Sequence, residues 1–321
     1  MANQNGNIGY EALTGAPRLL MECELKPLQG DRFQPTGFAD LGPARYTLPD
    51  GTEMLLIESA QSVANRMELA CWDQPAQDLI EPLRGLPYIK VNNKNGEHAT
   101  NSLLEAHRIN SEYIVGNSSD GKFKESFTAE IEYQKDGRVN WAKFRNALLK
   151  YDTNSLLHGC FIEEIGGRLR IARAVSGFIE ASGVTAAESG GVKNNIVQPD
   201  LKGGEGNVPF HRTEFVAKKI GAYFNLDLAL LRGYGLPDEA TRLLIALSLF
   251  KIQRFLSTGL RLRTACDLEP AGDGLKVTRP DGFTIQDAGP LLEECTTLIN
   301  KCKAAKLFAT PPITEVQWKS S

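Results

Sequence analysis

Apolar side chains recur along this chain with two periods, which together predict six core elements. Alternation predicts strands, and recurrence at i, i+3 and i+4 predicts helices. The elements read strand, helix, strand, strand, helix, strand, at residues 18–28, 58–72, 169–182, 212–235, 236–259 and 260–279. Arg173 interrupts the third element, which is therefore a strand or a strand pair, and the last is predicted to be a hairpin turning at PAGDG (270–274). This βαββαβ order is typical of ferredoxin-like α+β proteins.

Two segments interrupt this order, and a final amphipathic helix at residues 288–307 follows it. Residues 73–154 look like an insertion in which residues 101–114 and 140–151 have helical periodicity, with Asn140 as a suitable N-cap. Residues 183–209 hold six glycines and show no helical period. A loop of this length in a compact domain is usually functional or disordered.

The helix predicted at residues 58–72 has an unusual polar side. Two amides, a carboxylate and an indole fall on one narrow stripe, with a serine and an arginine beside it: Gln61, Asn65, Glu68 and Trp72, then Ser62 and Arg66. Ordinary solvated helix faces favour Lys and Glu. These side chains either are solvated and cap a neighbouring loop, or they face a ligand, and the helix alone leaves both interpretations open.

Composition is that of an ordinary globular protein, with 42% hydrophobic and 23% charged residues and a net charge of −3. This excludes an indiscriminate polyanion binder. The charge is nevertheless uneven, because residues 138–173 hold seven Lys/Arg against three Asp/Glu, whereas residues 47–81 hold one against seven. The six cysteines form no disulfide framework and no apolar run is long enough to span a membrane, so we expect a reduced, cytoplasmic protein.

The chain carries no signature of catalysis or of a bound cofactor. His158 and Cys160 are close in sequence, but no second pair lies at zinc spacing, so no metal site is predicted. Neither a nucleophile elbow nor a Gly-rich phosphate loop has the required spacing. Asp31 and Asp40 lie in the loop after the first strand, where carboxylates usually cap turns, and a metal or acid–base role is the alternative.

Nucleic-acid binding is better supported. Cations fall on loops or on a strand face that points away from the core, at Arg32, Arg45, Arg173, Arg212, Arg261 and Arg263. They are interleaved with aromatic residues at Phe33, Phe38 and Tyr46. RNA-binding proteins use cations for phosphates and flat rings or guanidinium planes for bases. A salt-bridged surface role fits each arginine taken alone, so the hypothesis rests on their joint placement.

Four blocks of the chain resemble a known family. They are LKPLQGDRFQPTGFADLGPARY, ESAQSVANRMELACW, GNVPFHRTEFVAKKIGAYFNLDLALLRGYGL and LSTGLRLRTACDLE. They strongly resemble the backbone subunit of type I-G (formerly I-U) CRISPR Cascade complexes, which belongs to the RAMP superfamily of CRISPR-associated RNA-binding proteins. The resemblance implies a hand-shaped α+β protein with an RRM-like palm, a helical finger-like insertion and a thumb loop. These parts would be residues 17–72, 155–182 and 210–307 for the palm, 73–154 for the insertion and 183–209 for the thumb loop.

The resemblance also implies a function without catalysis. Such a subunit binds CRISPR RNA (crRNA), repeats along it as a helical filament beside other Cascade subunits, and presents the guide for pairing with target DNA in antiviral defence. The implied RNA contacts are Gln61, Ser62, Asn65, Arg66, Arg32, Arg45, Arg173, His211, Arg212, Arg261 and Arg263. The implied thumb tip, which would contact the neighbouring subunit's RNA segment, is Val192, Lys193, Asn194, Asn195 and Ile196.

Two other functions stay open. In related type III assemblies the equivalent backbone subunit is a metal-dependent ribonuclease with an acidic residue in the loop after the first strand, where Asp31 lies. The second alternative is a small-molecule α/β enzyme, which would be a monomer or closed oligomer free of nucleic acid.

Overall fold

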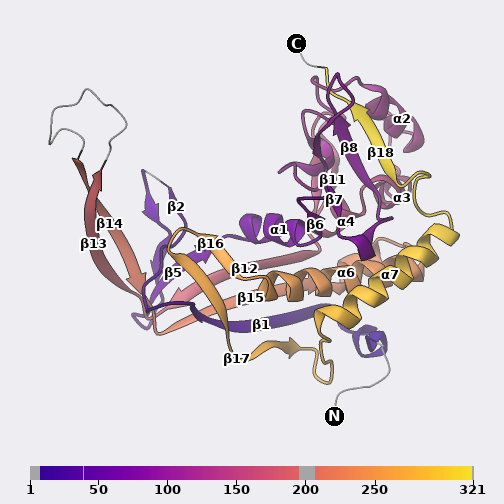
Figure 1. The fold of residues 1–321 in the computed structure, drawn as a ribbon. Coiled ribbons are helices and arrows are strands. Elements are labelled where there is room, and N and C mark those ends of the chain that lie inside the picture. Colours follow the sequence, from indigo (N-terminus) through magenta and orange to yellow (C-terminus); the bar gives the residue numbers. More distant parts are fainter. Residues whose placement is uncertain (1–7, 39, 195–206, 320–321) are drawn as a thin grey trace.

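The computed structural model describes residues 8–38, 40–194 and 207–319, and shows an α+β protein built on a curled sheet (Figure 1). The sheet has seven strands in the order β16-β17-β1-β15-β12-β5-β4, and each neighbouring pair is antiparallel. Their bounds are β1 (Arg18–Pro27), β4 (Arg45–Thr47), β5 (Glu53–Glu58), β12 (Val175–Ser182), β15 (Lys219–Asp227), β16 (Leu260–Arg263) and β17 (Cys266–Arg279).

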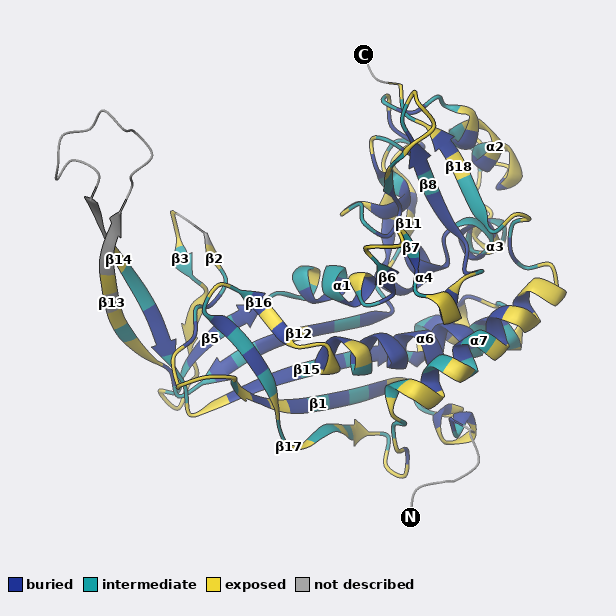
Figure 2. Cartoon of the chain, in the orientation of Figure 1, coloured by how far each residue is buried: buried dark blue, intermediate teal, exposed yellow. Residues whose placement is uncertain are grey.

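Helices cover one face of this sheet and leave the other open. Helices α1 (Ala60–Leu69) and α6 (Asp238–Ser257) pack against the sheet, and α7 (Ala288–Ala304) packs along α6. Strand β1 shows the consequence, because its alternate residues from Leu19 to Leu25 are buried while Glu24 on the opposite face is exposed. The buried colour runs along α6 in Figure 2, as the apolar run of its sequence predicts. None of the helices in the described ranges has the length and apolar character needed to cross a membrane.

The predicted order of core elements is found, with two positions corrected. Residues 169–182 hold two separate strands, β11 (Leu169–Ile171) and β12, which belong to different sheets. The strand predicted at residues 212–235 ends at Asp227, whose side chain accepts a 2.9 Å hydrogen bond from the Leu230 amide and caps the short helix α5 (Leu228–Gly233). The predicted turn at PAGDG is wrong: β16 turns into β17 at residues 264–265, and β17 runs through PAGDG as a bulge opposite β1. Leu25 pairs with Pro270 and Cys23 with Leu275, so β17 has more residues than β1 between these two pairs. The extra residues of β17 have no partner on β1 and form the bulge.

The segment expected to be a loop at residues 183–209 is a hairpin in its described part. Strands β13 (Thr185–Asn194) and β14 (Asn207–Val216) pair over ten residues and project from one end of the sheet (Figure 1). Thr185 and Glu188 are exposed, so no core imposes an apolar alternation that the sequence could display. Of the thumb residues expected from the resemblance, Val192, Lys193 and Asn194 end β13, whereas Asn195 and Ile196 lie outside the described residues.

Residues 88–158 and a C-terminal strand form a module with its own sheet, at the opposite end of the large sheet from the hairpin (Figure 1). Its strands are β8 (Tyr88–Asn92) and β9 (His98–Asn101), joined by the C-terminal strand β18 (Ile313–Gln317), which lies parallel to β8. Its helices are α2 (Lys122–Glu130), α3 (Trp141–Tyr151) and α4 (Thr153–His158). Asn140 caps α3 as predicted, accepting a 3.2 Å hydrogen bond from the Lys143 amide.

The prediction of a helix at residues 101–114 is wrong. Only a short 3-10 turn, η3 (Arg108–Asn110), forms there. The Asn101 side chain accepts hydrogen bonds from the amides of Leu103 and Leu104, at 2.9 and 3.1 Å. Such local side-chain bonds offer the backbone an alternative to helix, and they override the apolar periodicity here.

Short elements complete the described chain. They are η1 (Tyr10–Leu13), β2 (Gly37–Phe38), β3 (Gly42–Pro43), β6 (Trp72–Asp73), β7 (Asp78–Leu79), η2 (Glu81–Leu83), β10 (Cys160–Ile162) and α5 (Leu228–Gly233).

A buried ion pair joins α1 to the module. Glu68 and Trp72, expected on the polar stripe of α1, are buried, and Glu68 accepts two 2.7 Å hydrogen bonds from the Arg108 guanidinium. Asn154 also donates to Glu68, and Lys251 of α6 donates to Asn154. The carboxylate therefore turns inward because a cation from the inserted region meets it there.

Other titratable groups surround this pair. Burial raises the pKa of Asp152 to about 7, and burial together with Lys251 holds the pKa of His158 well below its ordinary value. Burial also lowers the pKa of Lys251, which lies 2.9 Å from the Nε2 atom of His158. The junction is thus a polar network inside an otherwise apolar core.

Replacing Glu68 with Gln is expected to lower the free energy of unfolding by about 3 kcal/mol, because Arg108 stays buried without its counter-charge. Urea denaturation of the full chain measures this. Glu269→Gln breaks the half-exposed pair with Lys26 and serves as the control, with an expected loss below about 1 kcal/mol. Equal losses in the two variants would contradict a structural role for the buried pair.

Asp152→Asn is expected to change how stability depends on pH. Since the folded Asp152 carboxyl keeps its proton to about pH 7 and the unfolded one loses it near its ordinary pKa, 3.8, the folded state binds more protons between these values. Raising the pH across this window therefore destabilises the wild type, and the variant gains relative stability by up to about 1 kcal/mol per pH unit. The pKa of His158 is shifted in the opposite direction, but it is shifted in both the wild type and the variant, so the comparison of the two proteins cancels its effect. Parallel stability curves from pH 4 to 7 would refute the assignment.

Candidate RNA-binding surface

The exposed side of α1 presents hydrogen-bond donors outward. Ser59 caps the helix by accepting from the Ser62 amide at 3.3 Å. Gln61 accepts a 2.7 Å hydrogen bond from Arg173 and donates at 2.9 Å to the side-chain oxygen of Asn65. This chain of bonds leaves the Asn65 amide nitrogen without a partner among the described residues, so its N–H groups face solvent. Donors in this position suit phosphate or 2′-hydroxyl oxygens.

Three of the arginines expected to bind RNA are used within the fold. Arg66 donates to the carbonyls of Arg261 and Leu262, which joins α1 to β16. Arg173 donates to the Ala60 carbonyl at 3.0 Å as well as to Gln61. The third, Arg263, pairs with the buried Glu58 and donates to the Gln34 carbonyl at 3.1 Å. Most of their donors are therefore already occupied.

Three of the other expected arginines gather at the base of the β13–β14 hairpin, whereas Arg261 lies on β16 beside Asp267. Arg32 and Arg212 each lie 3.1 Å from the Glu214 carboxylate, and Arg212 also donates to the Gln34 side chain at 2.9 Å. Arg45 pairs with Glu53 at 3.3 Å and lies over the Phe215 ring. A hollow of about 490 Å³ opens between this group and the β2–β3 turn. Carboxylates thus hold the arginines in place while the arginine side chains stay partly exposed.

Side-chain exposure distinguishes the cations that a bound RNA strand could reach from those that it could not. The side chains of Arg261, Arg32 and Arg45 are 76%, 57% and 44% exposed, against 24% for Arg263. His211 is exposed beside Glu188, with 2.5 Å between Nε2 and the carboxylate. Glu58 links the hairpin base to the α1 donors, because it contacts Arg263 and lies 4.0 Å from Arg66. The two groups of expected residues are therefore neighbours in space.

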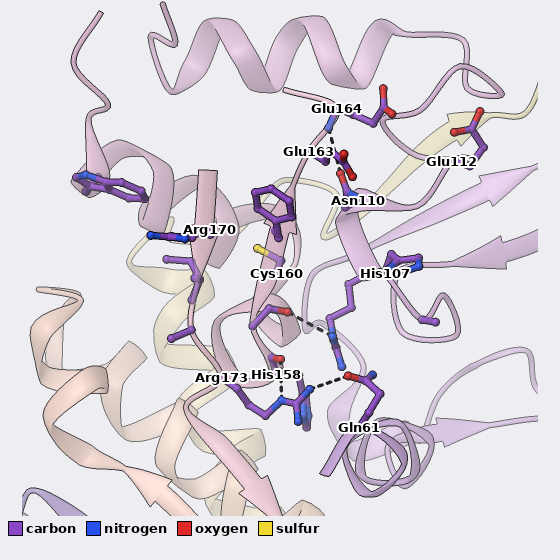
Figure 3. A pocket seen from close by; sticks show the side chains of 17 residues that line it. Gln61, His107, Asn110, Glu112, His158, Cys160, Glu163, Glu164, Arg170 and Arg173 are labelled. Carbon is purple, nitrogen blue, oxygen red and sulfur yellow. Dashed lines mark hydrogen bonds between the residues drawn. The ribbon is translucent and has the colours of Figure 1, made fainter. Parts of the chain in front are cut away.

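A larger pocket, which the sequence did not indicate, lies where α1 meets the module (Figure 3). Its volume is about 1,020 Å³, and Gln61 and Arg173 form part of its wall. Trp141 of α3, Phe161 of β10 and Arg170 of β11 also line it, with His107 from the residue before η3. No sequence signal connects these residues, because their proximity depends on how the module packs against the sheet.

No metal centre is found within the described ranges, where no group of three or more His, Cys, Asp or Glu side chains could hold an ion. Asp31 is exposed in the loop after β1. Burial raises the pKa of the Cys160 thiol in the pocket wall to about 12, so at neutral pH it is a protonated packing group and not a nucleophile.

Comparison with known proteins identifies the family. A family model described as CRISPR-associated protein GSU0053 (Cas_GSU0053) matches residues 19–186, from β1 through α1 and the module's β8 to α4 as far as β12 and the start of β13. The chain belongs to this family of CRISPR-associated proteins. No curated protein matches it.

Solved structures give weaker likenesses. A chain of a "CRISPR RNA-guided surveillance complex, pre-nicking" aligns with a TM-score of 0.45 at 14% identity, over 90% of this chain and 87% of that one. A chain of a "CRISPR RNA-guided surveillance complex" gives 0.40 at 15% identity, over 90% and 84%. Csc2 from Thermofilum pendens gives 0.33 at 11% identity, over 94% and 80%. With TM-scores below 0.5, these likenesses do not establish a common fold.

Substitution of Arg263 and Arg261 is expected to separate structural from exposed arginines. Arg263→Ala leaves the buried Glu58 carboxylate without its closest counter-charge and should lower the free energy of unfolding by about 2–4 kcal/mol. Arg261→Ala should change it by less than about 0.5 kcal/mol, because that side chain is exposed. Chemical denaturation of both variants measures the difference, and a similar loss in both would contradict the division drawn from the contacts.

Proposed function

We propose that this chain is the crRNA-binding backbone subunit of a Cascade-type, type I-G-like surveillance complex. The Asn65 amide on the exposed side of α1, together with the partly exposed arginines at the hairpin base, carries the proposal. Membership in a CRISPR-associated family supports it. The RNA backbone runs along α1, and the guide bases face outward for pairing with target DNA, which supplies the sequence specificity.

A ferredoxin-like, RRM-like palm fits this role. The strand order β17-β1-β15-β12, with antiparallel neighbours and helices α1 and α6 in the two crossovers, supports such a palm. In the proposed hand, the β13–β14 hairpin is the thumb and the module with β8 and α3 is the finger-like part. Figure 1 shows α1 between the hairpin and the module, where an RNA strand that crosses the proposed hand would lie.

The contacts assign the proposed roles unequally. Asn65, Arg32, Arg45 and Arg261 have the exposure needed to touch phosphate or ribose. Arg66, Arg173 and Arg263 instead hold the surface in shape. Amides and guanidinium groups aimed at the backbone do not discriminate bases, so one subunit can bind any guide sequence.

Assembly into a filament follows from the proposed hand. Thr185, Glu188 and His211 of the β13–β14 hairpin are exposed and the hairpin stands away from the large sheet, so a neighbouring copy could cover them without rearranging the palm. Such contact is heterologous and propagates into a helix along the RNA beside the other Cascade subunits. Copies bound to the same RNA also contact one another, which raises the effective concentration of each copy at its site. The assembly therefore binds RNA more tightly than a single copy does. The assembly acts in the cytoplasm, where its RNA is made.

Co-expression with a CRISPR array and the neighbouring Cascade genes tests the proposal. The expected result is a large complex on size exclusion with a high 260/280 nm absorbance ratio and RNA of uniform guide length. A protein-only species near 35.2 kDa under these conditions would overturn the proposal. Loss of magnesium-dependent cleavage of paired RNA in Asp31→Ala, with binding intact, would support the ribonuclease alternative instead.

Asn65→Asp tests the α1 donors directly. The substitution is nearly isosteric, but it replaces the amide donor with a carboxylate that cannot donate to a phosphate. RNA affinity should therefore fall at least about tenfold, since a hydrogen bond to a charged group contributes ~1.5 kcal/mol or more. Fluorescence anisotropy with labelled single-stranded RNA measures this at two salt concentrations. Asn300→Asp, at an exposed position of α7, is the matched control and should bind as the wild type does. Equal affinities for all three proteins would exclude the α1 surface.

A further inference from the structure

The junction pocket has the chemistry of a nucleotide site. Phe161 and Arg170 are cross-strand partners in the β10–β11 hairpin, so a ring and a guanidinium stand side by side on the pocket wall. Phe161 is 48% exposed and Trp141, at the start of α3, is 40% exposed. Large aromatic side chains left this open in a pocket are a common platform for bases of single-stranded nucleic acids.

Arg170 is available for an anion. Its side chain is exposed, and among the described residues no carboxylate or carbonyl is paired with its guanidinium. This distinguishes it from Arg173 and Arg108 in the same wall, whose donors are bound to protein acceptors. A cation without an internal partner among the described residues, beside the exposed Phe161 ring and in the same pocket as Trp141, fits a phosphate next to a stacked base.

The floor of the pocket is rigid and polar. Gly159 has a φ of 78°, and a Cβ atom there would lie 2.9 Å from the Ile171 carbonyl, so only glycine allows this close approach. Its carbonyl accepts a 3.3 Å hydrogen bond from Arg108. Next to it, the Nδ1 atom of the buried His158 has no hydrogen-bond partner in the described part of the chain.

The pocket is also electrically polarised. Figure 3 shows Glu112, Glu163 and Glu164 at one end and Gln61 with Arg173 at the other. A nucleotide can satisfy this lining, because its phosphate suits the Arg170 guanidinium and its ribose hydroxyl or base amino groups donate to the carboxylates. The basic end is continuous with the donors of α1.

We propose that the junction pocket binds one unpaired nucleotide of a single nucleic-acid strand, with the base against Phe161 and Trp141 and the phosphate at Arg170. This inference rests on the proposed function, since the strand reaches the pocket along α1 past Gln61. The unpaired nucleotide belongs either to the guide RNA or to a DNA strand of the target, and the experiment distinguishes these two sources.

Photocrosslinking tests the site in the full chain reconstituted with a synthetic guide. One arm carries 5-iodouridine in the guide, and the other carries 5-iodo-2′-deoxyuridine in an added single-stranded DNA. Adducts are mapped by mass spectrometry. An adduct at Phe161 or Trp141 in the first arm assigns the guide, and one only in the second arm assigns the DNA. Adducts confined to other residues in both arms overturn the proposal.

Two variants separate this proposal from the proposed function. Phe161→Ala and Arg170→Gln should each abolish the adduct. If the DNA strand is the one that crosslinks, its affinity should fall by about tenfold while guide affinity stays as in the wild type. If the guide crosslinks, its affinity should fall by about tenfold but not be lost, because the contacts along α1 and at the hairpin base remain. Phe178→Ala, at a 38% exposed aromatic on the open face of the sheet, is the matched control and should change nothing. Arg170→Gln alters only an exposed side chain, so it remains informative should Phe161→Ala fold poorly.

The remaining outcomes are decisive. Wild-type crosslinking and affinity in Phe161→Ala and Arg170→Gln would overturn the nucleotide site while leaving crRNA binding intact. A crosslink from a photoreactive amino acid at position 161 to a second copy of the chain would overturn it too, because the pocket would then hold a protein segment. If the wild-type protein itself did not bind the guide RNA, the proposed function would be refuted instead.

Discussion

The buried contact between Glu68 and Arg108 determines how the two halves of this molecule sit together. Glu68 belongs to α1, on the large sheet, and Arg108 to the inserted module, and their side chains meet through two 2.7 Å hydrogen bonds. Two buried charges are tolerated only when their geometry satisfies both, so the pair permits few alternative placements of the module. Asn154 and Lys251 extend the contact to α4 and α6. The position of the pocket wall follows from this constraint.

Arginines in this protein serve two purposes that composition does not distinguish. Arg66, Arg173 and Arg263 bond to carbonyls or to buried acids and join neighbouring elements. Arg32 is held by the nearly buried Glu214 and Arg45 by the partly exposed Glu53, and both arginines keep much of their surface exposed. A slightly acidic chain can thus offer a local cationic surface where a carboxylate such as Glu214 is buried and its arginine partner is not.

The surface of interest is assembled from distant parts of the sequence. Phe33 of the loop after β1 pairs with Phe215 in the hairpin through two backbone hydrogen bonds, of 2.9 and 3.0 Å. Gln34 in the same loop accepts from Arg212 and Arg263. These contacts fix the base of the hairpin against the sheet, so the direction in which it projects is set by the first loop as much as by its own strands.

The sequence by itself determined the elements whose cause is local. The apolar run of α6, the Asn140 cap of α3 and the alternation of β1 each follow from neighbouring residues, and the structure has all three. It also indicated the amides of α1, since Gln61 and Asn65 share a helical face. Tertiary structure alone decided the rest. Glu68 has the same helical phase as Asn65, yet it is buried, because a cation forty residues later reaches it. Strand β18 forms only against β8, and β13 and β14 lack a core that would impose alternation. The junction pocket likewise has no local signal, because its walls come from segments that meet only once the module has packed.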